Sequence, residues 1–189
     1  MDIQSNEHHL VLGQLNDFLT GQVLADTLDE RYRQKIAKKL VLDKGFVPSD
    51  ICSNKIIEVV VGSKKARLKI DFLVHYEDHI ICLIKYAPGS LVTRRLSTLA
   101  LSRIVVPYQI PIAIITNGED AEIIDGHTGC VIATGLESLL DKKSMIEKIE
   151  TMSFDPIHTI MFDKASRIAY ACEVESACPC DTDVCIINE

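Results

Sequence analysis

The sequence lacks any apolar run of the roughly 18 residues that a membrane-spanning helix needs. It also lacks the basic-then-apolar order of a signal peptide, because it begins MDIQSNEHHL. We therefore expect a cytoplasmic protein without a membrane partner. No internal repeat and no low-complexity linker is visible, and hydrophobic residues make up 47% of the 189 residues. Length and composition together predict one packed domain with a short appendage.

A basic charge balance is missing as well. The net charge of −7 argues against unspecific binding of nucleic acid by the chain as a whole. This charge is unevenly distributed, because residues 151–189 hold seven acidic and two basic residues, which leaves a charge of −2 for residues 1–150. Basic clusters in that first part are either contacts for nucleic-acid phosphates or solvated surfaces, and they comprise Lys64, Lys65, Arg67 and Lys69 and the pair Arg94 and Arg95.

The order of apolar patterns predicts an α/β or α+β domain in which helices pack against a mixed sheet. Helical spacing of apolar residues predicts helices over 9–21, 27–45, 91–106, 136–150 and 163–175. Apolar runs bounded by turn residues predict strands over 55–61, 66–74, 79–86, 110–116, 121–125 and 130–134. The residues beyond 175 are expected to be irregular, and Gly118 is expected to supply a positive φ in the turn TNGED.

The stretch KIDFLVHYEDHIICLIKYAPG, residues 69–89, carries Asp71 on one predicted strand and Lys85 on the next. Metal-dependent cleavage of a phosphodiester needs carboxylates that hold Mg²⁺, and it is helped by a cation that orients the attacking water. Residues two apart on a strand point to the same face, so a second carboxylate two residues before Lys85, at position 83, would lie on the same face as Lys85. Position 83 is a leucine, which cannot bind a cation. The hairpin is therefore either part of a nuclease site or an ordinary solvated pair.

Four segments carry a resemblance to a known family: DERYRQKIAKKLVLDKGF, KIDFLV, LIKYAPGS and IPIAIITNGEDAEIID. Together they resemble the N-terminal domain of type I restriction enzyme R subunits, and most of all the small stand-alone proteins that carry this domain. The resemblance covers about residues 25 to 135. It implies the PD-(D/E)XK, or restriction-endonuclease-like, fold over residues 1–150, followed by a helical, Cys-rich extension over residues 151–189.

The resemblance also implies site residues. It places Asp71 at the metal-binding aspartate, Lys85 at the catalytic lysine and Glu30 at a helix-borne acid that assists the metal. The second metal carboxylate of the family falls at Leu83, and there the pattern fails. A displaced carboxylate would restore a Mg²⁺ site, and Glu58 on the preceding strand is the best candidate.

Each of these residues also has an interpretation without catalysis. Glu30 lies three residues after Thr27, which is the spacing of a capping box at the start of a helix. Asp71 stands in an apolar strand, where a buried charge needs a partner, so Asp71 and Lys85 form a credible ion pair without chemistry. Both interpretations stay open at the level of sequence.

The last four of the seven cysteines crowd into fourteen residues: Cys172, Cys178, Cys180 and Cys185. Thiolates at such short spacing bind Zn²⁺ or an iron–sulfur cluster, although this spacing matches no standard zinc-finger or ferredoxin motif. The alternative is a set of free thiols in a frayed tail.

Three functions follow as hypotheses. The first is a nuclease-fold protein with a degraded catalytic site that binds a nucleic acid, such as DNA, or a protein partner. The second is an active Mg²⁺-dependent DNA endonuclease that uses Asp71, Lys85 and a displaced carboxylate. The third is a metal- or redox-responsive module that operates through its C-terminal cysteines. The sequence does not define an oligomeric state.

Overall fold

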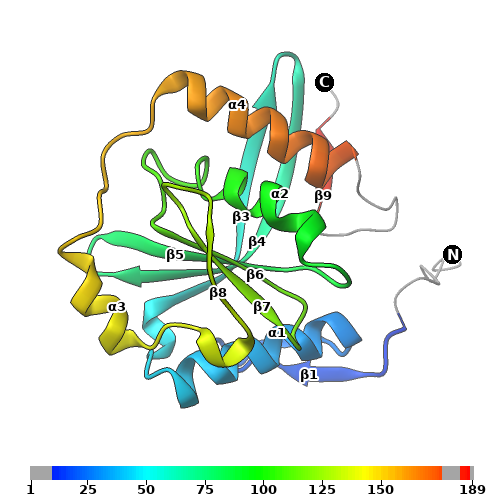
Figure 1. Ribbon diagram of the computed structural model, residues 1–189. Helices are drawn as coiled ribbons and strands as arrows, with labels where there is room; N and C mark the ends of the chain where they lie inside the picture. The colour runs from blue at the N-terminus through cyan, green and yellow to red at the C-terminus, as the bar shows by residue number, and fades with distance from the viewer. Residues whose placement is uncertain (1–9, 176–183, 188–189) are drawn as a thin grey trace, which may run out of the picture.

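The computed structural model of the chain describes residues 10–175 and 184–187 (Figure 1). Within these ranges a seven-stranded mixed sheet carries helices on both faces. Its strands are β3 (Ile51–Val61), β4 (Lys64–Tyr76), β5 (His79–Tyr86), β6 (Ile112–Thr116), β7 (Ala121–Asp125), β8 (Val131–Thr134) and β9 (Val184–Ile187). The α-helices are α1 (Leu28–Lys38), α2 (Arg95–Leu101), α3 (Lys142–Ile149) and α4 (Thr159–Ala169). The prediction of a mixed sheet flanked by helices is confirmed.

Shorter helical segments adjoin several of these elements. Two π-helical segments, η1 (Lys39–Asp43) and η5 (Tyr170–Glu175), directly continue α1 and α4. Three single turns of 3₁₀-helix are η2 (Pro48–Asp50), η3 (Val92–Arg94) and η4 (Leu136–Ser138). No helix within the described residues is long and apolar enough to cross a membrane.

The sheet follows the chain in the order β3-β4-β5-β6-β7-β8, and β9 pairs antiparallel with β4. Among the strand pairs that the structure describes, only β5–β6 is parallel, and α2 lies in the crossover between these two strands. The chain therefore runs from α1 through three antiparallel strands to α2 and then to a buried parallel strand.

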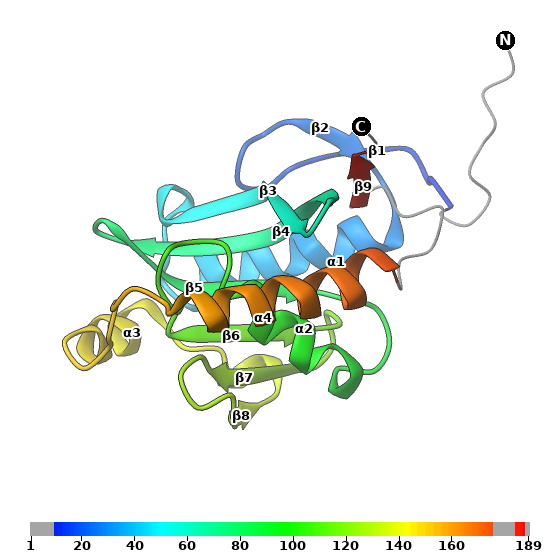
Figure 2. The same cartoon turned by 90° about the horizontal axis from the view of Figure 1, so that it is seen from above.

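Two layers of side chains hold the helices to the sheet. Ile36, Ala37 and Leu40 of α1 and η1 join one apolar cluster with Met145 of α3. A second cluster contains Leu101 of α2 and several residues of α4 and η5. Figures 1 and 2 show the resulting arrangement, in which α1 lies on one side of the sheet and α2 and α4 lie on the other. The described part of the extension thus packs directly on the sheet.

β4 and β5 separate at Asp71. Their ladder ends at the pair Phe72↔Ile84, while β4 runs back to Lys64 without β5 beside it. Phe72 belongs to the cluster under α1, whereas Ile70 belongs to the cluster under α4. In a flat strand with regular alternation, the side chains of Ile70 and Phe72 would point to the same face of the sheet. Because they point to opposite faces, β4 must twist or bulge around Asp71. The edge that β5 leaves is taken by β9, which pairs with residues 65–68.

The helix predicted over 9–21 is wrong. This segment instead forms the strand β1 (Gln14–Asn16), which pairs with β2 (Val23–Ala25). The Asp17 carboxylate accepts hydrogen bonds from the backbone N–H groups of Leu19 and Thr20, so the chain turns there instead of winding on. The leucine spacing suggested an amphipathic helix, yet Leu10 and Leu12 are exposed and face no core.

Two further predictions are corrected in extent. The helix expected over 91–106 is α-helical only over Arg95–Leu101, because the chain turns at 102–106 so that the backbone N–H of Ile110 can bond the Ser102 carbonyl. The expected irregular tail contains β9, which forms because β4 offers it an unpaired edge.

Candidate functional site

Asp71 lies at the point where β4 and β5 separate, and its side chain is fully buried. One carboxylate oxygen accepts a hydrogen bond from Arg33 Nε of α1 at 2.6 Å. The other oxygen accepts one from the Tyr86 backbone N–H at 2.9 Å and lies 3.5 Å from Lys85 Nζ. The carboxylate therefore takes the place of a backbone acceptor at the end of the ladder and joins α1 to β5.

Lys85 meets a second carboxylate that comes from far along the chain. Its ammonium lies 3.9 Å from Glu173 Oε2 of η5, and it donates a hydrogen bond to the Lys69 carbonyl at 3.2 Å. Lys85 and Glu173 are each 10% exposed. The amino group is thus held between Asp71 and Glu173, and the structure brings the predicted pair Asp71 and Lys85 together as an ion pair.

Charge and burial act in opposite directions on the Asp71 carboxyl. Burial raises its pKa, but the positive charges of Lys85 and Arg33 and the hydrogen bonds from Arg33 and the Tyr86 backbone N–H outweigh burial, so the pKa lies below the usual value for aspartate. Asp71 is therefore an anion at neutral pH. It is stabilised by cations of the protein itself.

Leu83 is completely buried. It pairs with Leu73 across the β4–β5 ladder and belongs to the apolar cluster that includes Tyr170 and Val174 of η5. Position 83, to which the resemblance assigns a second metal carboxylate, is therefore part of the core together with residues of η5.

Glu30 lies in the first turn of α1 and contacts the site indirectly. Its backbone N–H donates to Thr27 Oγ1, as the capping box predicted, but its side chain accepts a hydrogen bond from Gln34 Nε2 at 2.7 Å. A Glu30 oxygen also lies 3.8 Å from Arg33, the residue that bonds Asp71. Glu30 therefore helps to orient α1 side chains around Asp71.

Glu58 lies away from this group. It is exposed and stands opposite Arg67 in the β3–β4 ladder. Arg67 is four residues before Asp71, a separation of about 13 Å along a strand. The structure does not bring Glu58 together with Asp71, and Glu173 is the carboxylate found beside Lys85.

The predicted phosphate-binding residues have different surroundings. Lys64 pairs with Glu175 at 2.7 Å, and Arg94 donates to the Cys172 carbonyl at 3.4 Å. Arg95 forms a two-pronged ion pair with Glu122 of β7. Lys65 stands opposite Val60 of β3 and Ile187 of β9. Lys64 and Arg94 thus both contact η5.

The structure describes two of the four cysteines in the predicted metal-binding cluster. Cys172 lies on η5 and the exposed Cys185 on β9, and these two elements pack against each other. Cys178 and Cys180 lie outside the described residues. Within residues 10–175 and 184–187, no group of three or more His, Cys, Asp or Glu side chains is arranged to hold a metal ion.

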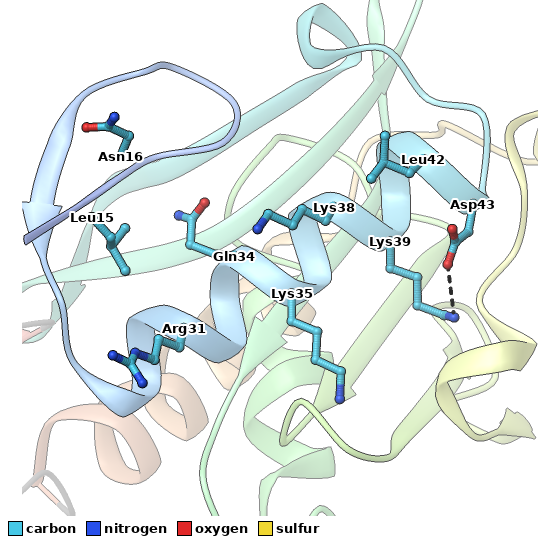
Figure 3. A pocket seen from close by; sticks show the side chains of 9 residues that line it. All are labelled: Leu15, Asn16, Arg31, Gln34, Lys35, Lys38, Lys39, Leu42 and Asp43. Atoms are coloured by element: carbon cyan, nitrogen blue, oxygen red, sulfur yellow. Dashed lines mark hydrogen bonds and ion pairs between the residues drawn. The ribbon is translucent and has the colours of Figure 1, made fainter.

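A separate cavity of about 570 Å³ lies between β1 and α1 (Figure 3). Four cationic side chains line it: Arg31, Lys35, Lys38 and Lys39. Neighbouring carboxylates neutralise much of this charge, because Arg31 forms an ion pair with Asp26 and Lys39 forms ion pairs with both Asp43 and Glu137. We therefore assign no ligand to this cavity.

Comparison with known proteins identifies the family. A family model described as type I restriction enzyme R protein N terminus matches residues 28–139, which is more than half of the chain. The chain belongs to this family. No curated protein and no solved structure gives a significant match. The region matched to the R protein N terminus begins with α1 and ends after η4, so it contains Asp71 and Lys85 but not Glu173.

Arg33 and Glu173 are the site residues that sequence reasoning missed. Arg33 stands four residues before Ala37 on the helix predicted over 27–45, and a cation facing inward there is visible only once α1 is docked on the sheet. Glu173 lies outside the R protein N-terminus match, and no motif connects it with Lys85. Its one sequence signal is the excess of acidic residues after position 150.

Proposed function

We propose that this protein is a restriction-endonuclease-like module that binds nucleic acid without cutting it. The order of one helix, three antiparallel strands, a second helix and a parallel strand supports that fold for a member of the R protein N-terminus family. The observation that carries the proposal is the state of Asp71, whose two oxygens are already bonded by Arg33 and Tyr86 and lie beside Lys85.

The residues present do not fit a Mg²⁺ ion. Magnesium requires near-octahedral oxygen ligands at about 2.0–2.1 Å, and it usually takes one or two carboxylates. At Asp71 a guanidinium nitrogen stands 2.6 Å from one oxygen, where it would repel the ion. Leu83 offers no oxygen and lies in the core. These facts support a site that keeps the aspartate and the lysine of its family as a structural ion pair.

Nucleic acid is favoured over a protein partner by the cations on the α4 side of the sheet. Lys64, Lys85 and Arg94 come from β4, β5 and η3 and converge on one short segment, η5. Convergent cations from separate elements are suited to phosphates, whose contacts position a nucleic acid without reading its sequence.

One observation favours the alternative of an active endonuclease. Glu173 lies beside Lys85, as Asp71 does, and is therefore a better candidate for the displaced carboxylate than Glu58. Cleavage would require Asp71 to leave Arg33, so that both carboxylates could face a metal. We keep this alternative because one experiment separates it from the proposal.

We expect the purified protein to bind a short labelled DNA duplex but not to nick plasmid DNA with Mg²⁺ or Mn²⁺. Binding is measured by fluorescence anisotropy over about 50–200 mM salt, where phosphate contacts make the affinity fall steeply. The matched nicking control is Glu173→Gln. Metal-dependent nicking that Glu173→Gln abolishes without unfolding the protein would establish the endonuclease instead.

We also propose that Cys172, Cys178, Cys180 and Cys185 bind one Zn²⁺ ion or one iron–sulfur cluster. The spacing of the four thiols and the packing of η5 on β9 support this proposal. Protein purified without oxygen should then contain about one zinc per chain, or iron with visible absorption.

Elemental analysis and a visible spectrum check this expectation. Cys180→Ser should remove most of the metal, whereas the control Cys130→Ser, which changes an exposed cysteine on a loop before β8, should not. Substoichiometric zinc and iron in the wild-type protein would exclude the metal centre.

A further inference from the structure

Residues of η5 contact cationic side chains from three separate elements. Glu175 pairs with Lys64 of β4 at 2.7 Å, and Glu173 lies 3.9 Å from Lys85 of β5. The carbonyl of Cys172 accepts a hydrogen bond from Arg94 of η3. Three acceptors within four residues thus contact the same convergent cations that support nucleic-acid binding.

Apolar contacts and β9 hold this segment in place. Tyr170 and Val174 are buried in the cluster under α4, and the Lys64 ammonium lies 5.6 Å from the centre of the Tyr170 ring. Beyond η5 the chain returns as β9 to pair with residues 65–68 of β4. Figure 1 shows α4 and β9 lying alongside β3 and β4.

Two of the three polar contacts that link η5 to Lys64, Lys85 and Arg94 are individually weak. The Lys64–Glu175 pair is more than half exposed on both sides, and such pairs contribute little because water screens them. The Arg94 hydrogen bond is long at 3.4 Å, and Lys85 retains Asp71 when Glu173 is absent. A ligand with several phosphates can therefore compete for these cations with η5.

We infer that η5 is an intramolecular mimic of nucleic-acid phosphates that covers the phosphate-binding cations of its own sheet. The inference rests on the proposed nucleic-acid function. The charge distribution agrees with it, because residues 151–189 carry −5 of the total charge and η5 places two of those carboxylates on Lys64 and Lys85. Nucleic acid and η5 then bind in competition.

The test is the affinity of the double variant Glu173→Gln/Glu175→Gln for a labelled DNA duplex. Loss of both carboxylates should tighten DNA binding about fivefold to tenfold, because each ion pair that the DNA must displace contributes a factor of about five or less. The plot of log affinity against log salt should steepen by about one to two, since up to two more cations contact phosphate. The matched control is Glu147→Gln/Glu150→Gln, which changes the net charge equally at exposed positions around the end of α3.

A third variant tests whether the tighter DNA binding of the double variant depends on Lys64. Lys64→Gln added to the double variant should remove most of the tightening, and thermal unfolding checks that every variant is folded. Single Glu175→Gln, at an exposed position, serves if the double variant unfolds.

The outcomes separate the inference from the function on which it rests. If wild-type protein and the double variant bind DNA equally, or if the control tightens binding as much, the phosphate-mimic inference fails and the proposed function stands. If no variant binds DNA, both fail.

Discussion

Asp71→Asn is expected to lower the free energy of unfolding by about 3 kcal/mol, because it leaves two buried cations without their shared anion. Asparagine preserves the shape of the side chain, but its single oxygen can accept a hydrogen bond from only one of Arg33 and the Tyr86 N–H, and its NH2 group then faces the other donor. The loss therefore combines the charge opposite Arg33 and Lys85 with one buried hydrogen bond. Chemical denaturation of both proteins measures it.

Asp163→Asn is the matched control for Asp71→Asn, because Asp163 lies exposed on α4 and its loss should change stability by less than about 0.5 kcal/mol. The cost of Asp71→Asn should also shrink when Lys85→Met is present, since removing both charges leaves less charge unpaired. Equal costs in the two backgrounds would show that Asp71 and Lys85 do not interact.

The effect of Asp71→Asn has a defined pH dependence. The folded-state pKa of Asp71 is lowered, so its carboxylate stabilises the fold fully above the unfolded pKa, about 3.9. That stabilisation disappears as pH falls through the lowered folded-state pKa. The stability difference between wild type and Asp71→Asn should therefore be constant near neutrality and vanish only in acid.

Leu83→Glu is expected to unfold the protein, or to cost about 3–5 kcal/mol, and not to create a nuclease. Leu83 is 0% exposed and surrounded by the cluster that α4 and η5 cover. A carboxylate there would lose its water, so it would protonate or disrupt the packing. Leu83→Met is the control, since it conserves volume and should cost less than about 1.5 kcal/mol.

A carboxylate at position 83, where the resemblance places a second metal ligand, is therefore not expected to create a metal site as long as η5 stays in place. Plasmid nicking by Leu83→Glu, combined with unfolding measurements, tests this statement. A variant that folds within about 1 kcal/mol of wild type and nicks DNA with Mg²⁺ would contradict it, and would mean that a single residue separates this chain from an active enzyme.

Several elements were predicted well from apolar alternation, capping residues and turn residues, because these local patterns determine short segments without contacts to distant parts of the chain. The strands at 79–86 and 121–125 match the predicted ranges, and Thr27 caps α1 as its spacing indicated. Gly118 has φ +85°, and a Cβ there would lie 2.2 Å from the Tyr32 ring of α1, so the turn also fits against the helix. Backbone conformation and apolar period are properties of short segments.

The remainder depended on contacts between distant segments. The helix predicted over 9–21 is replaced by a turn at Asp17, whose carboxylate accepts hydrogen bonds from the backbone N–H groups of Leu19 and Thr20 and from Gln34 of α1. The partner of Lys85 could not be found from spacing, because Glu173 is 88 residues away and reaches it only through the path of α4. Asp71 and Lys85 were predicted together, and Arg33 decides what that pair can do.

The separation of β4 and β5 has one more consequence. It leaves four residues of β4 with a row of backbone N–H and C=O groups that β9 satisfies from the end of the chain. Release of this strand would expose an open sheet edge, to which an extended peptide or a second copy can add by main-chain hydrogen bonds. Displacement of η5 together with β9 would thus offer two surfaces at once: cations for a polyanion and a template for a strand.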